Sequence, residues 1–378
     1  MKHLIKLQNE DNILVSCELT NFYDPEKIYV PLYGDRKIND YVYKNTFLNN
    51  YIISVSGKIS NLSKVIYDGS LINTLVIDND YLEEVNTNNF KEVNTLDDLN
   101  YLLDKNNLIK LKNKLNKGNY KNFVVTCIDE EACISTECTI MCNYYKEILD
   151  IIDKLSIMLN FKSVTVASKN TSSESIKNIK SNIGMYPNIR VKLVPDKYLI
   201  SRKEFLTKYL NIDLETSLVL NTKELFYLYN LFKFNVLNEV VISVSGNALK
   251  KGVNLKVKIG VCLEEIIEKY LEILDSDYEI FVNGLIGGKK ANANNIIVTP
   301  YTTNFVINKK NTVKSLSCIN CGACQKICPY NINTLKCLKE NLKSKKCIGC
   351  GLCNYICPAI LDIRGKVEDS IWKEVLVF

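Results

Sequence analysis

Two short runs of cysteine near the carboxyl end constrain this chain more than any other feature. Both follow the pattern C-x2-C-x2-C-x3-C-P, and a proline, Pro329 or Pro358, closes each run. The cysteines are Cys318, Cys321, Cys324 and Cys328, then Cys347, Cys350, Cys353 and Cys357. This spacing is typical of thiolates that hold two four-iron clusters. It predicts that the segment folds around metal rather than around a large apolar core.

The unequal spacing has a physical reason. Three thiolates on one tight loop reach three corners of an iron–sulfur cube, while the fourth, one turn of chain later, points to the other cube, as in bacterial ferredoxins. We therefore assign the first cluster to Cys318, Cys321, Cys324 and Cys357, and the second to Cys347, Cys350, Cys353 and Cys328. Structural zinc is the alternative, but zinc sites normally use two separated C-x2-C pairs.

Cysteine usage and charge indicate the environment of the protein. The chain has 15 cysteines in 378 residues, most of them between Cys318 and Cys357, and no apolar signal core or membrane-spanning run. This pattern favours metal or redox chemistry under reducing conditions, in the cytoplasm or peripherally on the cytoplasmic face of a membrane. The formal charge of +6 is small, and lysines are interleaved with acids, so nucleic-acid binding is not indicated.

The residues ahead of the cysteine runs change pattern twice. Residues 28–80 read as short strands broken by Gly and Asn turns, which predicts a small all-β module. From residue 123 to residue 235, strand patterns alternate with amphipathic helix patterns, which predicts a parallel sheet flanked by helices. Asn221 and Glu224 have capping-box spacing at the start of the last of these helices. Two more strands and a helix then lead to the cysteine segment.

Three stretches carry a resemblance to a known family. They are "VPLYGDRKINDYVYKNTFL" followed by "SVSGKI", then "VVISVSGNALKKGVNLKVKIG", and finally "NGLIGG". With the order of the modules, they are similar to the RnfC component of the Rnf complex, the ion-translocating ferredoxin:NAD oxidoreductase. The chain resembles the flavin-bearing subunit of respiratory complex I more distantly. Asn39 and Asn45 replace two glycines of the family, and these replacements cost little if Asn takes up the left-handed turn conformation.

The resemblance implies an α/β multidomain fold with four parts. The first is a small β barrel-sandwich hybrid module at residues 1–84, and the second is a central α/β parallel-sheet domain at 85–236, of a degenerate flavin/NAD-binding type. A β-grasp module follows at 237–310. The last part is a C-terminal ferredoxin-like α domain at 311–378 with two 4Fe–4S clusters.

The central domain departs from the family pattern. The family has a glycine-rich loop there, which cradles flavin and nucleotide phosphates with backbone amides. The corresponding stretch, "NTLDDLNYLLDKNNLIKLKNKLNKGNYKN", reads as a helix and a linker in which Gly118 is the only glycine. Bulky side chains would block a phosphate, so we expect FMN and NADH binding to be lost and assign no cofactor-binding or catalytic residue.

The stretch "VVTCIDEEACISTE" resembles the acidic strand end that follows this loop in the family. Asp129 and Glu131 match its two acids, and they are interpreted either as a retained site or as a solvated strand-to-helix turn. Nearby cysteines have spacings that match no metal pattern, so free thiols are the default and redox function the alternative. They are Cys127, Cys133, Cys138 and Cys142.

The leading functional hypothesis is an iron–sulfur electron-transfer protein that relays single electrons between protein redox partners, such as a ferredoxin, a flavoprotein or a reductase. Within the same scaffold, the proline reductase-associated electron-transfer protein is a second model. An FMN-dependent NADH dehydrogenase subunit is the enzymatic alternative, and it requires the flavin. A subunit whose clusters only stabilise the fold is the structural alternative.

Overall fold

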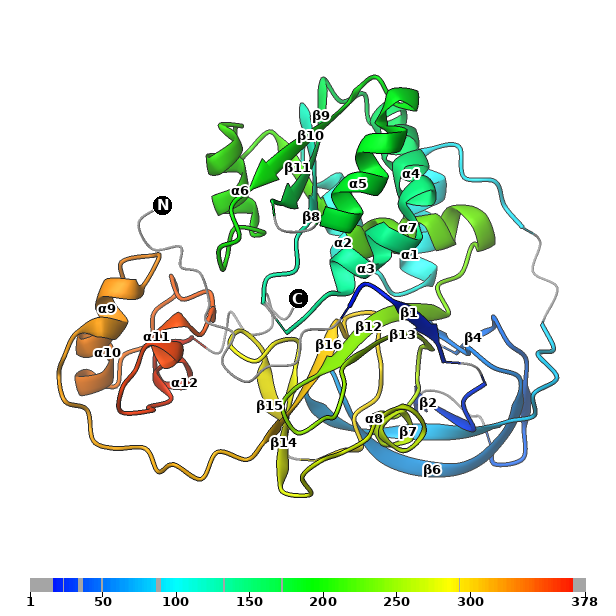
Figure 1. Ribbon diagram of the computed structural model, residues 1–378. Coiled ribbons are helices and arrows are strands. Elements are labelled where there is room, and N and C mark those ends of the chain that lie inside the picture. Colours follow the sequence, from blue (N-terminus) through cyan, green and yellow to red (C-terminus); the bar gives the residue numbers. More distant parts are fainter. Residues whose placement is uncertain are drawn as a thin grey trace.

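The computed structural model describes residues 16–22, 24–32, 37–48, 50–85, 90–131, 133–170, 173–291 and 293–369. Within these residues the chain forms four sheets, and a group of short helices stands at one end of the molecule (Figure 1). The mixed α/β class predicted from the sequence is confirmed.

The amino-terminal module is an open antiparallel sheet with the order β2-β7-β6-β3. Its strands are β2 (Lys27–Pro31), β7 (Ser70–Asn79), β6 (Gly57–Tyr67) and β3 (Tyr41–Val42), and β4 (Phe47–Leu48) pairs separately with β5 (Tyr51–Ile52). Asp68 and Gly69 join β6 to β7 with φ of 46° and 84°, which suits a tight hairpin turn. Among the described residues of this module the sheet does not close into a barrel, so the barrel-sandwich hybrid stays a prediction.

Asn39 and Asn45 take the backbone conformation that the family's glycines would supply. Their φ angles are 78° and 64°, so both residues meet the condition under which replacing glycine by asparagine costs little. Asn tolerates this region better than most residues because its short side chain can hydrogen-bond locally.

The central domain is built on a parallel sheet with the order β10-β9-β8-β11. Its strands are β8 (Asn122–Cys127), β9 (Ser163–Lys169), β10 (Ile189–Val194) and β11 (Ser217–Asn221). Phe123 and Val125 belong to the main core, whereas Val124 packs in a second cluster with Leu206. Alternate side chains of β8 therefore face opposite layers, as the period of a strand requires.

Helices cover both faces of this sheet. The helix α6 (Lys203–Leu210) lies on one side, and the others gather on the opposite side (Figure 1). They are α3 (Thr136–Asn143), α4 (Tyr145–Met158), α5 (Ser173–Asn182), with the short η1 (Ile183–Met185), and α7 (Thr222–Phe234). The capping box of Asn221 and Glu224 at the start of α7 is confirmed. The predicted alternation of strands and helices is therefore correct.

The stretch predicted as one helix and a linker folds as two helices. They are α1 (Leu96–Lys105) and α2 (Ile109–Asn116). The linker prediction is wrong because Leu111 and Leu115 of α2 are buried in the main core. Their four-residue spacing places both leucines on one face of a helix.

The third module is a six-stranded mixed sheet with the order β1-β13-β12-β16-β14-β15. Its elements are β1 (Leu19–Asn21), β12 (Glu239–Ser245), β13 (Val253–Lys258), α8 (Leu263–Tyr270), β14 (Tyr278–Val282), β15 (Lys289–Ala291) and β16 (Asn304–Lys309). The strand β1 comes from the amino-terminal segment and pairs parallel with β13. The amino-terminal segment therefore completes a sheet of the third module, which no local sequence pattern indicates.

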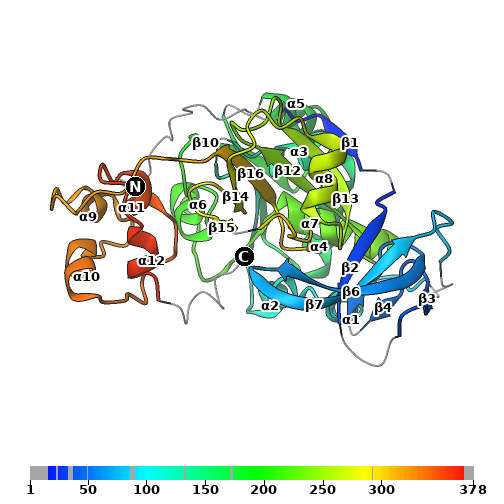
Figure 2. The same ribbon diagram turned by 90° about the horizontal axis from the view of Figure 1, so that it is seen from below.

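The carboxyl-terminal domain contains only short helices among the described residues. They are α9 (Ala323–Ile327), α10 (Thr334–Glu340), α11 (Leu352–Tyr355) and α12 (Ile363–Val367). Figures 1 and 2 both place them beyond α6, at one end of the molecule. In the part of the chain that the structure describes, every helix is too short or too polar to cross a bilayer.

Candidate metal centre

Each cysteine run folds as a loop that leads into a short helix. Gly322 and Gly351 both have φ of 75°, and α9 and α11 begin at the next residues. Glycine enters this left-handed conformation without the Cβ clash that other residues meet. The two runs therefore make the same local turn.

The eight cysteines of the two runs line two separate pockets, four in each. The first pocket, of about 310 Å³, is lined by Cys318, Cys321, Cys324 and Cys357. The second, of about 380 Å³, is lined by Cys328, Cys347, Cys350 and Cys353. Each run thus contributes three cysteines to one pocket and its last cysteine to the other. This grouping matches the two ligand sets assigned from the sequence, and the ligation itself stays a prediction.

Apolar side chains complete both pockets. Leu335, Leu338 and Ile363 line the first, and Ile332, Leu352 and Val367 line the second. The Thr334 hydroxyl donates a hydrogen bond to Cys324 Sγ at 3.0 Å. Four thiols within an apolar wall fit an iron–sulfur cluster. The thiolates would bind the iron atoms, while the apolar wall limits access of water and the hydroxyl donates a hydrogen bond to a ligand sulfur.

The two pockets differ in exposure. Cys318 and Cys321 of the first pocket are exposed, so we call it the outer pocket. In the second, the inner pocket, Cys350 is buried, and burial raises its pKa to about 11. Burial likewise raises the pKa of Cys353 to about 12. Metal binding at the inner pocket must therefore displace thiol protons.

The inner pocket contacts the central domain and the "NGLIGG" stretch. The Tyr198 hydroxyl donates to the Cys350 carbonyl oxygen at 2.6 Å. Arg364 donates to the carbonyl oxygens of Ile286 at 3.1 Å and Gly288 at 2.5 Å. A Cβ at Gly351 would come within 2.0 Å of the Ile286 oxygen, so only glycine allows this approach. The ferredoxin-like domain is thus attached through its inner pocket.

Glu131 holds the loop at residues 285–288, which contacts the inner pocket. Its carboxylate accepts hydrogen bonds from the backbone N–H groups of Leu285 at 2.7 Å, Ile286 at 3.1 Å and Gly287 at 2.9 Å. These amides belong to the "NGLIGG" stretch, and together they form a concave anion site that a carboxylate of the chain itself fills. Burial raises the pKa of Glu131, and the hydrogen bonds from the three backbone amides oppose that shift.

Asp129 is also used within the fold. Its carboxylate accepts from the N–H groups of Glu137 at 2.8 Å and Cys138 at 3.1 Å, in the first turn of α3. Only 8% of Asp129 and 4% of Glu131 is exposed, so the solvated-turn interpretation of these acids is wrong. Burial raises the pKa of Asp129 to about 7.

The four cysteines near these acids do not form one group. Cys127 and Cys133 are buried. Cys138 and Cys142 instead approach Cys17, which no sequence motif marks, and the three sulfur atoms lie within 4.8 Å of one another. The i, i+4 spacing of Cys138 and Cys142 could have revealed that they share a helix face. Nothing local could have indicated Cys17, which is more than a hundred residues away.

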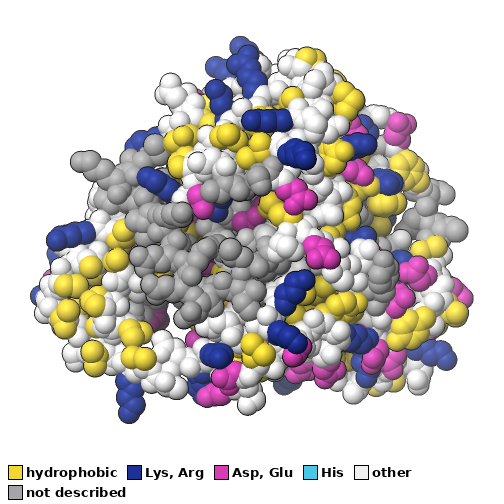
Figure 3. All heavy atoms as spheres, viewed as in Figure 1, with side chains coloured by type: hydrophobic (Ala, Val, Ile, Leu, Met, Phe, Trp, Pro, Cys, Tyr) yellow, Lys and Arg dark blue, Asp and Glu magenta, His cyan; other side chains and the backbone are white. Residues whose placement is uncertain are grey.

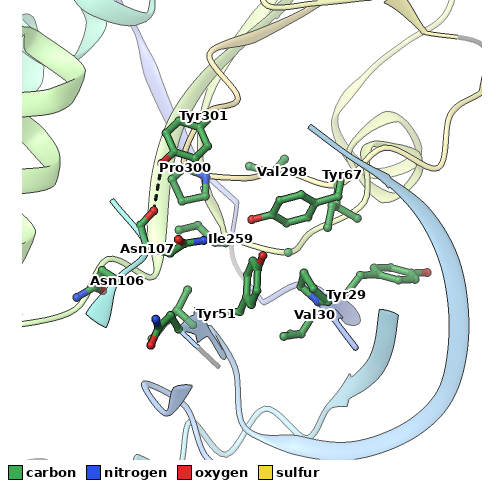
Figure 4. Close-up of a pocket in the computed structure, with 15 residues that line it drawn as sticks. Tyr29, Val30, Tyr51, Tyr67, Asn106, Asn107, Ile259, Val298, Pro300 and Tyr301 are labelled. Carbon is green, nitrogen blue, oxygen red and sulfur yellow. Dashed lines mark hydrogen bonds between the residues drawn. The ribbon is translucent and has the colours of Figure 1, made fainter. Parts of the chain in front are cut away.

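A further pocket, of about 410 Å³, is lined by the amino-terminal module, the connection between α1 and α2, and the segments that follow β13 and precede β16. Tyr51, Tyr67 and Tyr301 line it, and Tyr301 donates to the Asn107 carbonyl oxygen at 3.1 Å (Figure 4). It has no cysteine in its lining, so it is separate from the two cysteine pockets.

Comparison with known proteins supports the metal chemistry of the carboxyl-terminal domain. Residues 312–332 match the family model described as a 4Fe–4S binding domain, which supports at least one such cluster and a role in electron transfer. None of the curated proteins compared matches the sequence.

The chain is also similar to solved structures of an NAD+-reducing NiFe-hydrogenase. For the air-oxidized state the TM-score is 0.44 at 10% identity, covering 54% of this chain and 43% of that chain. For the H2-reduced state the TM-score is 0.41 at 10% identity, covering 53% and 42%. The chain therefore spans less than half the length of these structures.

Proposed function

We propose that this chain is an iron–sulfur electron-transfer protein of the RnfC type, with two 4Fe–4S clusters that connect protein redox partners. When bound, such clusters accept and release one electron at a time. The outer and inner cysteine sets are the proposed ligands. The observation that carries the proposal is the exchange of the last cysteine between the two runs, which gives each pocket four thiols.

The surface near the outer pocket suits a protein partner. Val313, Leu316 and Ile319 are 62–64% exposed, and they lie in the segment of chain that leads into the exposed Cys318 and Cys321. Figure 3 shows hydrophobic side chains gathered over this end of the molecule. Exposed apolar side chains gathered on one part of a surface are typical of interaction sites. We call Val313, Leu316 and Ile319 the outer patch and assign it to the docking of a redox partner.

Charge around the patch favours an acidic partner. Between residues 311 and 369, basic side chains outnumber acidic ones. Complementary charge accelerates encounter and makes the rate depend on ionic strength. A small acidic ferredoxin is therefore the preferred partner within the proposal, and a flavoprotein or a reductase, such as an amino-acid reductase, is the alternative. Such partners place the protein in the cytoplasm or at the cytoplasmic face of a membrane.

The residues of the central domain do not fit a flavin. The place of the family's phosphate loop is taken by α1 and α2, whose leucines are buried in the main core. The amides of residues 285–287 are already occupied by Glu131. A phosphate would need free backbone amides at close approach, as at other anion sites. These contacts support a relay without FMN and oppose the alternative of an NADH dehydrogenase.

The test is anaerobic purification followed by iron and flavin analysis and an NADH-dependent dye reduction assay. We expect two clusters per chain, no stoichiometric flavin and no NADH turnover. Redox titration by electron paramagnetic resonance should find both clusters at low potential, on the order of −400 mV. Stoichiometric flavin with NADH turnover would overturn the relay in favour of the dehydrogenase. Clusters that no physiological donor reduces would leave only a structural role.

A further inference from the structure

A second group of thiols lies far from the cysteine runs. Cys17 Sγ lies 2.8 Å from Cys138 Sγ, which in turn lies 3.9 Å from Cys142 Sγ. We call these three residues the trithiol cluster. Cys17 and Cys142 are half-buried, so a small ion has access to the cluster from solvent. Neither the iron–sulfur domain nor the proposed relay uses these sulfur atoms.

Two segments far apart in the chain bring the cluster together. Cys138 and Cys142 stand one turn apart on α3, so their side chains share a face. Cys17 precedes β1, and the Asn143 side-chain amide donates to its carbonyl oxygen at 3.1 Å. Ser135 donates from its hydroxyl to the carbonyl oxygen of Ser16 at 3.3 Å. The segment of Cys17 is thus held to both ends of α3, which aims its thiol at the other two.

The distances suit a single metal ion. Zinc–thiolate bonds of about 2.3 Å in tetrahedral geometry place the sulfur atoms about 3.8 Å apart. The Cys138–Cys142 distance of 3.9 Å agrees with this value, and all three atoms lie within 4.8 Å. Cys17 and Cys138 would separate by about an ångström to bind one ion. A four-iron cube holds its thiolates at its corners, farther apart than a single ion does.

The local electrostatics favour a cation. The sulfur atoms of Cys17 and Cys138 lie only 2.8 Å apart, so two thiolates there would repel each other unless a cation lay between them. The carboxylates of Asp129 and Glu174 add negative charge near Cys17. The amides of Glu137 and Cys138 in the first turn of α3 already donate to the Asp129 carboxylate, so a cation rather than the helix must balance a thiolate at Cys138. A thiophilic cation would offset the repulsion among these groups.

We propose that Cys17, Cys138 and Cys142 bind one thiophilic metal ion of the zinc class through three thiolates, with the fourth position open to water. Soft thiolate ligands select such ions over magnesium or calcium. The ion would tie the segment before β1 to α3, and so join the six-stranded sheet to the central domain. This site is independent of the proposed electron relay.

The test uses the cluster-loaded full chain, dialysed anaerobically against zinc and analysed for metal content. We expect one additional zinc per chain, with three sulfur neighbours at about 2.3 Å in zinc-edge X-ray absorption. This measurement is element-specific, so the iron does not interfere with it. The Cys138→Ser variant should lose the zinc, while the matched Cys262→Ser variant, which alters a buried thiol at the start of α8, should retain it.

Three outcomes would overturn the proposal. The first is zinc at background level in the wild-type chain. The second is zinc that persists in both Cys138→Ser and Cys17→Ser, or that disappears when a cysteine of either run is replaced, which would place it in the iron–sulfur domain. The third is a metal-free native chain in which mass spectrometry finds a Cys17–Cys138 disulfide. Cys17→Ser, outside any helix, serves as the second variant if Cys138→Ser does not fold.

Discussion

The outer pocket exposes Cys318 and Cys321 to solvent, whereas the inner pocket keeps Cys350 buried against the central domain. Each pocket is lined by four cysteines, and the two runs make the same turn at Gly322 and Gly351. Their surroundings differ because only the inner loop meets Tyr198 and the "NGLIGG" stretch. One repeated motif therefore forms both a pocket at the surface and a pocket anchored to the central domain, and under the proposed function the first would face a redox partner.

The largest expected effect comes from the cysteine that crosses between the runs. Cys328 belongs to the first run but lines the inner pocket. The Cys328→Ser change should reduce the iron content from about eight to about four atoms per chain and remove the inner signal from the electron paramagnetic resonance spectrum. Cys357→Ser is the matched control, and it should remove the outer signal instead. If Cys328→Ser removed the outer signal, the assignment of Cys328 to the inner cluster would be wrong.

The next largest effect concerns the support beneath the inner pocket. Replacing Glu131 by Ala leaves the amides of residues 285–287 without their carboxylate acceptor. Buried donors without partners are costly, so we expect a loss of about 3–5 kcal/mol in unfolding free energy, measured by urea denaturation. Glu204→Ala, at an exposed acid on α6, is the control. Equal stability losses in the two variants would contradict the role of the amide site.

The same residue predicts a dependence on pH. Burial raises the pKa of Glu131 in the folded state above its ordinary value of 4.5. The folded chain therefore binds more protons than the unfolded chain, and its stability falls as pH rises from about 4 through the folded pKa. Glu131→Gln should show a shallower fall over this range in urea titrations. A steeper fall in the variant would reverse the sign that we assign.

A smaller effect should follow from Tyr198→Phe. The change removes the hydrogen bond from the tyrosine hydroxyl to the Cys350 carbonyl oxygen. We expect a loss of about 1 kcal/mol in unfolding free energy, and a shift in the reduction potential of the inner cluster but not of the outer one. Potentiometric titration of each resonance signal measures this selectivity. Equal shifts in the reduction potentials of both clusters would show that Tyr198 does not act on the inner cluster selectively.

The smallest effect on stability is expected at the outer patch. Leu316 is 64% exposed, so Leu316→Glu should change the unfolding free energy by less than about 0.5 kcal/mol. It should nevertheless slow electron exchange with a small acidic ferredoxin several-fold, since it adds like charge at the docking face. Stopped-flow reduction measures this rate. Leu71→Glu, at an equally exposed leucine in the amino-terminal sheet, is the control and should leave it unchanged.

Local patterns were enough to predict much of the fold. Strand and helix periodicity predicted the parallel sheet and the capping box at Asn221, because these depend on neighbouring residues. Asn39 and Asn45, where the family has glycines, take left-handed turns, which asparagine tolerates through local hydrogen bonds. The helix α2 was missed: its buried leucines are few, and its polar residues look like those of a linker.

Contacts between distant segments were not predictable in this way. The strand β1 joins a sheet whose other strands lie more than two hundred residues later. Glu131 was assigned to an acidic strand end, but its amide partners lie over a hundred and fifty residues away. Periodicity describes the face that a residue presents, not the partner that covers it.

The sequence by itself determined the metal chemistry, because thiolate spacing on a tight loop is a local property that limits which clusters the chain can hold. The tertiary structure alone decided how these sites differ. In the folded chain Cys350 is buried against Tyr198, and the Glu131 carboxylate accepts hydrogen bonds from the amides of residues 285–287. The fold also brings Cys17 into contact with Cys138. Burial and long-range contact depend on how whole modules pack, and no spacing within one segment encodes that packing.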